Sequence, residues 1–165
     1  IHIVHQGVMK ITLFMAAGNY AETLGIHNVS ELSGVGRRMP WTTAAFTLAA
    51  LGMIGFPPLA GFVSKWYLGL GAWESGANWV LAVLLISGLL NAAYFLPLLY
   101  RAWFEPKPAA WPQPRILSRV FETHALLLFP PLVTALLVLL LGIFAGLNVT
   151  TLGWVQWLIN QEFSL

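Results

Sequence analysis

Four long apolar stretches occupy most of this chain and constrain its fold more than any other feature. They cover about residues 1–20, 41–72, 79–104 and 125–147. A helix needs about 20 apolar residues to cross roughly 30 Å of hydrocarbon. Only 8% of the residues are charged, whereas a soluble domain has about 25%. We therefore predict an all-α membrane protein, a multi-helix transmembrane bundle in which residues 1–165 form one unit.

The second apolar stretch contains an interruption, GFPPLAGFVSKW, which starts at Gly55. At about 1.5 Å per residue, the stretch is too long for one straight crossing and too short for two. Pro57 and Pro58 lack a backbone N–H and disfavour the α conformation in the residue before each. Gly55 and Gly61 allow the backbone to bend or unwind. We predict one discontinuous crossing, broken at residues 56–60, with a plain kink as the alternative.

The basic residues support a single broken crossing. They gather in two segments, one before the second stretch and one between the third and the fourth: Arg37, Arg38, Arg101, Lys107, Arg115 and Arg119. A single crossing between 41 and 72 places both segments on one side, which the positive-inside rule makes cytoplasmic. Two crossings would place them on opposite sides. We expect a multi-pass protein of the cell inner (plasma) membrane, with the lipid bilayer as its main surroundings.

Lys10 and Lys65 sit well inside apolar stretches. A charge at bilayer depth costs a few kcal/mol or more, so such residues usually face a bundle interior or water and mark a transport route. Snorkelling of the lysine stem to the headgroups is the alternative. Lys65 follows the break by about one turn, where a helix start exposes N–H groups with partial positive charge. That field and burial both favour the neutral amine, so we expect Lys65 to release and regain a proton.

A group of polar residues, here named the polar stripe, lies on the first stretch: His2, His5, Gln6 and Lys10. Positions 2, 6 and 10 share one helix face, and His5 flanks it. These side chains are suited to passing protons directly or through water, since histidine titrates near neutral pH. Buried polar groups that bind neighbouring helices are the alternative.

Several other functions are disfavoured by the composition. The chain has no cysteine, which excludes disulfides and thiolate metal sites. The two histidines of the polar stripe have no acidic partner nearby, so we expect no metal. The net charge of +2, without a basic cluster, predicts no nucleic-acid partner. We expect no catalytic site and no cofactor in this chain. Because it begins IHIVHQGVMK, we interpret it as a piece of a longer protein, with a complete small membrane protein as the alternative.

Two motifs carry a resemblance to a known family. HIVHQGVMKITLFMAAG resembles the helix H-x-x-x-H-x-x-x-K-a-x-L-F-L-x-x-G of the antiporter-like subunits of respiratory complex I and of Mrp-type Na⁺/H⁺ antiporters. GFPPLAGFVSKW resembles the signature G-x-P-P-x-x-G-F-x-S-K of the broken helix in their second inverted repeat. The resemblance implies a fold of fourteen membrane helices in two inverted repeats, of which this chain would hold the last four.

The resemblance also implies roles for individual residues. Lys10 matches the central channel lysine, Lys65 matches the lysine of the broken helix, and His2 matches one histidine of the family motif. Gln6 stands where complex I members commonly have the second histidine, and His5 is adjacent to it.

We therefore expect a proton-translocating subunit of a multisubunit cation/proton antiporter, with protons and sodium as candidate ions. Trp66 stands where complex I members often have an acidic residue, which favours a protein similar to the D-type component of Mrp antiporters. The alternatives are a proton-pumping subunit of NADH:quinone oxidoreductase or of a related membrane-bound hydrogenase, and a purely structural membrane scaffold.

Overall fold

The computed structural model describes residues 1–108, 110–112, 121–147, 153–155, 157 and 161. Its main elements, in chain order, are all helices: α1 (His2–Leu24), the 3-10 helix η1 (Val29–Leu32), α2 (Val35–Arg38), α3 (Pro40–Ile54), α4 (Ala60–Glu74), α5 (Asn78–Phe104) and α6 (Ala125–Ile143). The predicted all-α class is confirmed by these helices.

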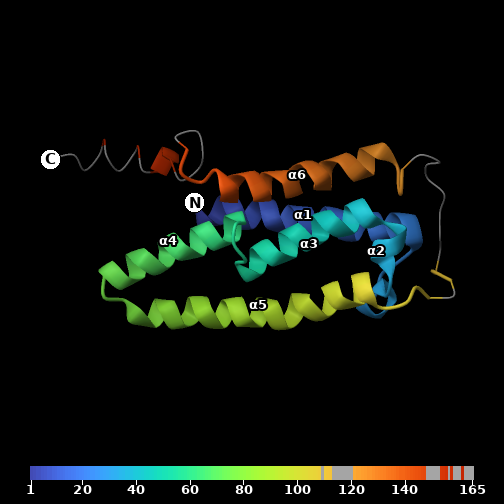
Figure 1. The fold of residues 1–165 in the computed structure, drawn as a ribbon, viewed down its shortest axis with the longest axis horizontal. Coiled ribbons are helices and arrows are strands. Elements are labelled where there is room, and N and C mark those ends of the chain that lie inside the picture. Colours follow the sequence, from blue (N-terminus) through green and yellow to red (C-terminus); the bar gives the residue numbers. More distant parts are fainter. Residues whose placement is uncertain (109, 113–120, 148–152, 156, 158–160, 162–165) are drawn as a thin grey trace.

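The helices α3 and α4 together take the place of one long helix in the bundle. They follow one another in the same direction, and α5 runs back along both of them (Figure 1). On the other side, α1 packs against α3, α4 and α6. The interruption falls at residues 55–59, here named the α3–α4 junction, within one residue of the predicted 56–60. This arrangement agrees with a single discontinuous pass through the bundle.

Two helices in the described part of the chain, α5 and α6, are long and apolar enough to cross a membrane. The helix α3 is apolar but shorter, as expected for half of a broken crossing. The helix α1 has 23 residues and carries the polar stripe. The crossings at 1–20 and 41–72 therefore remain predictions.

Asn19 joins α1 to α6 at a carbonyl that a proline has freed. Pro131 has no backbone N–H, so the Leu127 carbonyl lacks its usual intrahelical donor. The side-chain amide of Asn19 donates to this carbonyl at 2.8 Å, and Asn19 is buried. In a bilayer, where water cannot replace a lost bond, such a donor stabilises the proline-containing helix.

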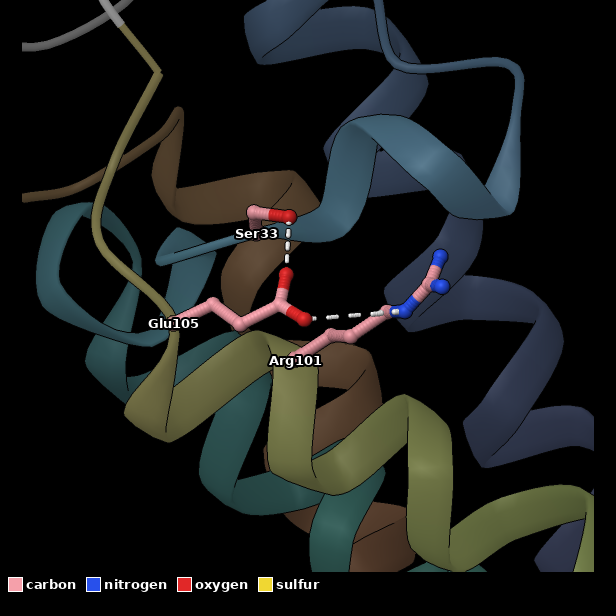
Figure 2. Close-up of polar contacts among 3 residues, drawn as sticks. All are labelled: Ser33, Arg101 and Glu105. Atoms are coloured by element: carbon pink, nitrogen blue, oxygen red, sulfur yellow. Dashed lines mark hydrogen bonds and ion pairs between the residues drawn. The ribbon is translucent and has the colours of Figure 1, made fainter.

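The loop after α1 is tied to the end of α5. The hydroxyl of Ser33 donates to Glu105, and Arg101 lies 3.8 Å from the same carboxylate (Figure 2). The amide of Gly34 also donates to the Arg101 carbonyl at 3.0 Å. These contacts place the two basic segments at one end of the bundle, as the single broken crossing requires. Arg115 and Arg119 lie outside the described residues.

Glu122 holds the start of α3. Its carboxylate accepts from the backbone amide of Trp41 at 2.9 Å and from the amide and hydroxyl of Thr42 at 2.6 Å each. A carboxylate is stabilised at a helix N-terminus, where unpaired N–H groups and the helix dipole meet it. The segment before α6 is thereby anchored to α3 at the same end of the bundle.

Candidate functional site

The α3–α4 junction begins at Gly55, which ends α3 in a left-handed conformation with φ of 98°. Its amide donates to the Leu51 carbonyl at 3.0 Å, and the Phe56 amide donates to the same carbonyl at 2.9 Å. A left-handed residue after a helix favours glycine, because a side chain there is strained. Pro57 and Pro58 follow, and the helical hydrogen bonding resumes at Ala60. The chain thus leaves the helical path at Gly55 and the two prolines.

Gly61 lies in the first turn of α4, just after the break, where it allows a close approach between helices. A Cβ atom at Gly61 would lie 1.8 Å from the carbonyl oxygen of Gly52 on α3. Gly142 on α6 makes a similar approach, with an added Cβ 1.9 Å from the carbonyl oxygen of Pro58. Glycine at these positions lets α4 and α6 pack directly on the backbone of α3 and of the junction. Sequence reasoning missed Gly52 and Gly142, since a glycine inside an apolar helix does not reveal which helix it touches.

The Lys65 amine reaches back from α4 to the end of α3. Its Nζ donates to the carbonyl of Met53 at 2.9 Å and to that of Ile54 at 3.0 Å, and the residue is half-buried. We expected the positive start of α4 to be the helix end that matters for this amine. Instead, its hydrogen bonds are to the C-terminal carbonyls of α3, which carry partial negative charge and stabilise an ammonium group. The field of α3 therefore opposes the field that we had predicted from α4.

A cavity of about 630 Å³ opens beside the Lys65 amine, between α4 and α5. We name it the Lys65 cavity. Its walls are mostly apolar, and α5 contributes small residues opposite the amine as well as leucines: Leu81, Leu84, Leu85, Gly88, Leu89 and Ala92. The Lys65 amine is therefore bound at the end of α3 and also open to this cavity.

His2 and Gln6 of the polar stripe lie against α4 and form a connected set of hydrogen bonds. The His2 Nδ1 lies 2.9 Å from Ser64 Oγ, and the Gln6 amide nitrogen lies 3.3 Å from His2 Nε2. Ser64 itself donates to the Gly61 carbonyl at 3.2 Å. The Gln6 nitrogen only donates, so this contact fits the tautomer of His2 that carries its proton on Nδ1. Ser64 was not among the predicted site residues, although it precedes Lys65 in the quoted motif.

His5 is almost completely buried, with 1% of its surface exposed. Its Nδ1 lies 2.8 Å from the carbonyl oxygen of Ala60, the first residue of α4. A carbonyl only accepts, so this nitrogen carries a proton. His5 thus fixes α1 to the residue at which the chain leaves the junction and becomes helical again.

Lys10 lies apart from the rest of the polar stripe. It is exposed on α1, and within the described residues it makes no hydrogen bond or ion pair that joins it to His2 or Gln6. It lines a second cavity of about 460 Å³, here named the Lys10 cavity, between α1, α3 and α5. This cavity extends to His27 and Asn28 in the loop after α1. Among the residues that the structure describes, no group of three His, Asp or Glu side chains is placed to hold a metal ion.

Comparisons with known proteins agree with the two motifs. The family model described as "NADH:quinone oxidoreductase/Mrp antiporter, TM" matches residues 1–91. The N-type component of NADH-quinone oxidoreductase from Desulforudis audaxviator is 41% identical over 150 residues, which is 87% of this chain and 30% of the relative. The D-type component of the Na⁺/H⁺ antiporter from Bacillus subtilis is 30% identical over 143 residues, which is 86% of this chain and 28% of the relative.

The fold agrees with a solved structure of an Mrp complex from Dietzia sp. DQ12-45-1b. The TM-score is 0.69 at 24% identity, over 86% of this chain and 33% of the solved chain. The chain thus spans about 30% of the length of these two relatives. Together with the match over residues 1–91, the two motifs and the interrupted helix lead to one conclusion: the chain belongs to the NADH:quinone oxidoreductase/Mrp antiporter transmembrane family.

Proposed function

We propose that this chain is part of a proton-translocating membrane subunit, in which Lys10 and Lys65 carry protons and His2, His5 and Gln6 assist them. The observation that supports this most is the position of the Lys65 amine, at a helix end inside the bundle and beside a cavity. Ionisable residues within membrane helices commonly mark ion pathways, and transporters commonly form their binding sites at discontinuous helices.

The end of α3 lies between the two lysines. Met53 lines the Lys10 cavity, and its carbonyl accepts from the Lys65 amine. A proton that moves between Lys10 and Lys65 would therefore pass the C-terminal end of α3, with water in the Lys10 cavity on one side and in the Lys65 cavity on the other. The Lys10 cavity reaches the loop at the basic end of the bundle, which would give Lys10 access to that side.

The hydrogen bonds of His2 suggest separate roles for the polar stripe. An amide does not readily carry a proton, so Gln6 acts by orienting the His2 ring. In this structure the Gln6 nitrogen donates to neutral His2. If His2 gains a proton, the amide can turn and accept through its oxygen. His2 then exchanges protons while Ser64 holds its other nitrogen, and His5 holds α1 against Ala60.

Substitution of the two lysines tests this proposal in the assembled membrane complex, reconstituted in vesicles with a pH-sensitive dye. Proton movement should fall to the background leak in Lys10→Ala and in Lys65→Ala. Lys107→Ala is the matched control, since Lys107 is an exposed lysine in the loop after α5, and it should transport normally. Wild-type rates in either test variant, with the complex intact, would refute the role of that lysine.

Two kinds of membrane complex are candidates for the one to which this subunit belongs. A multisubunit cation/proton antiporter is favoured by Trp66, which stands where the family resemblance places an acid in complex I members. A proton-pumping NADH:quinone oxidoreductase is favoured by the 41% identity with the N-type oxidoreductase component, against 30% with the D-type antiporter component. In both, the partners are other subunits of a complex in the cell inner membrane. Proton uptake driven by a sodium gradient would support the first setting, and uptake driven by NADH the second.

A further inference from the structure

The backbone carbonyls at the end of α3 find their hydrogen-bond donors outside the helix, and Lys65 is one of these donors. The last four carbonyls of a helix lack intrahelical donors, and at α3 these belong to residues 51–54. The Gly55 amide donates to the carbonyls of Leu51 and Gly52, and the Phe56 amide donates to that of Leu51. The carbonyls of Met53 and Ile54 accept from the Lys65 amine. The ammonium group thereby completes the cap that the glycine and the following amide begin.

This cap depends on the charge of the amine. An ammonium donor forms stronger, charge-assisted hydrogen bonds than a neutral amine, and it is attracted by the negative end of the helix dipole. Without the ammonium group, the carbonyls of Met53 and Ile54 lose donors that the mostly apolar walls of the Lys65 cavity do not replace. Proton loss from Lys65 therefore weakens the contact between α4 and α3 at the point where the chain is interrupted.

We propose that Lys65 is the C-terminal cap of α3, and that its proton holds the α3–α4 junction closed. Release of the proton loosens the junction, so proton transfer and movement of the broken helix are coupled at one residue. The coupling rests on the proposed function, in which Lys65 gives up its proton. The cap does not depend on that function, because it follows from the hydrogen bonds of the amine alone.

Few charged groups face this amine. From α1, His2 lies within electrostatic range of Lys65, and His5 contacts the Ala60 carbonyl. The residues of α3 and α5 that line the Lys65 cavity carry no acid or base. Within the described residues, His2 is therefore the group whose charge would act on Lys65 together with the end of α3.

Two substitutions separate the cap from proton transfer. Lys65→Arg keeps a permanent charge that can bind carbonyls but does not release its proton. Lys65→Met keeps the apolar stem and removes the donor. The measurement is hydrogen–deuterium exchange at the amides of Gly55 and Phe56 in the intact complex, because both amides lie within this cap. Proton transport of the same samples is measured in parallel.

At one pH, exchange at these two amides should be about tenfold faster in Lys65→Met than in the native protein, and near native in Lys65→Arg. Raising the pH should speed exchange in the native protein more than in Lys65→Arg. Equal exchange in the Arg and Met variants would overturn the cap. Continued proton transport in Lys65→Arg, with the exchange difference preserved, would instead refute the proposed function and leave the cap standing.

The native protein provides a second measurement if a variant fails to assemble. The amides of Ser75 and Gly76 close the C-terminal end of α4 through backbone bonds to Gly71 and Trp73, without a lysine donor. The intrinsic rate of amide exchange rises with pH by the same factor at both helix ends. The ratio of exchange at the α3 end to exchange at the α4 end should therefore rise with pH. A constant ratio up to the highest pH at which the complex stays intact would contradict the coupling.

Discussion

Gly61→Ala should disable the site by separating α4 from α3. The new Cβ would lie 1.8 Å from the Gly52 carbonyl oxygen, whereas real Cβ contacts below 3.0 Å essentially do not occur. The backbones must therefore part by more than an ångström. A displacement of that size also moves the backbone that carries Lys65 away from the Met53 carbonyl, to which its amine donates at 2.9 Å. Overpacking of this kind typically costs about 1–3 kcal/mol of stability.

The effect on transport should be larger than the effect on stability. A misplacement of about 1 Å in a functional group can lower a rate on the order of 100-fold. Gly71→Ala is the matched control, since it lies on the same helix and an added Cβ there meets nothing within 4 Å. It should transport normally, and alanine is a better helix former than glycine. Native proton transport in Gly61→Ala, measured in vesicles, would refute the close approach of the two helices.

Two further predictions concern other parts of the fold. Asn19→Leu removes the donor to the Leu127 carbonyl and should cost about 1–3 kcal/mol in thermal unfolding of the complex. Adding Pro131→Ala should restore most of that loss by supplying a backbone N–H, and a double variant no more stable than the single one would contradict this account. In the loop after α1, hydrogen bonds from the Asn28 side chain and then from nearby backbone amides lower the pKa of Glu31 below its ordinary value of 4.5. Because the pKa is lowered in the folded loop, the carboxylate stabilises the loop above pH 4.5 and loses this effect as the pH falls through the lowered value. Protection of the Asn28 amide from exchange should decrease in that range, and the decrease should be absent in Glu31→Gln.

The interruption of α3 and α4 was predictable because its cause is local. Pro57 and Pro58 remove N–H donors, and Gly55 permits the left-handed turn, so the chain itself prevents a continuous helix. The boundaries in the structure fall within two residues of the predicted ones. The family motifs are also short continuous stretches of sequence, so they can be recognised without the fold. The comparison over residues 1–91 confirmed the family that they indicated.

The partners of the site residues were harder to predict, because they depend on which helices meet. Spacing places His2, Gln6 and Lys10 on one face of α1, yet α4 packs against only part of that face, and Lys10 lies apart. The periodicity of α1 contains no information on where its neighbours end. For Lys65, the short distance in sequence to the start of α4 led us to predict that this helix end would act on the amine. In the structure, the flexible four-carbon stem of Lys65 reaches the end of α3 instead.

Polar side chains from other segments bind the ends of the interrupted helix. The end of α3 receives the Lys65 amine from the next helix, and its start receives the Glu122 carboxylate from the loop before α6. The carbonyl of Ala60, the first residue of α4, accepts from His5 of α1. Unpaired backbone groups at a helix end inside a bilayer need partners from the protein, so residues that we propose for proton transfer also hold the broken helix together. Under the proposed cap, a change in the protonation of Lys65 therefore acts on the packing of α4 against α3 as well as on the charge of the site.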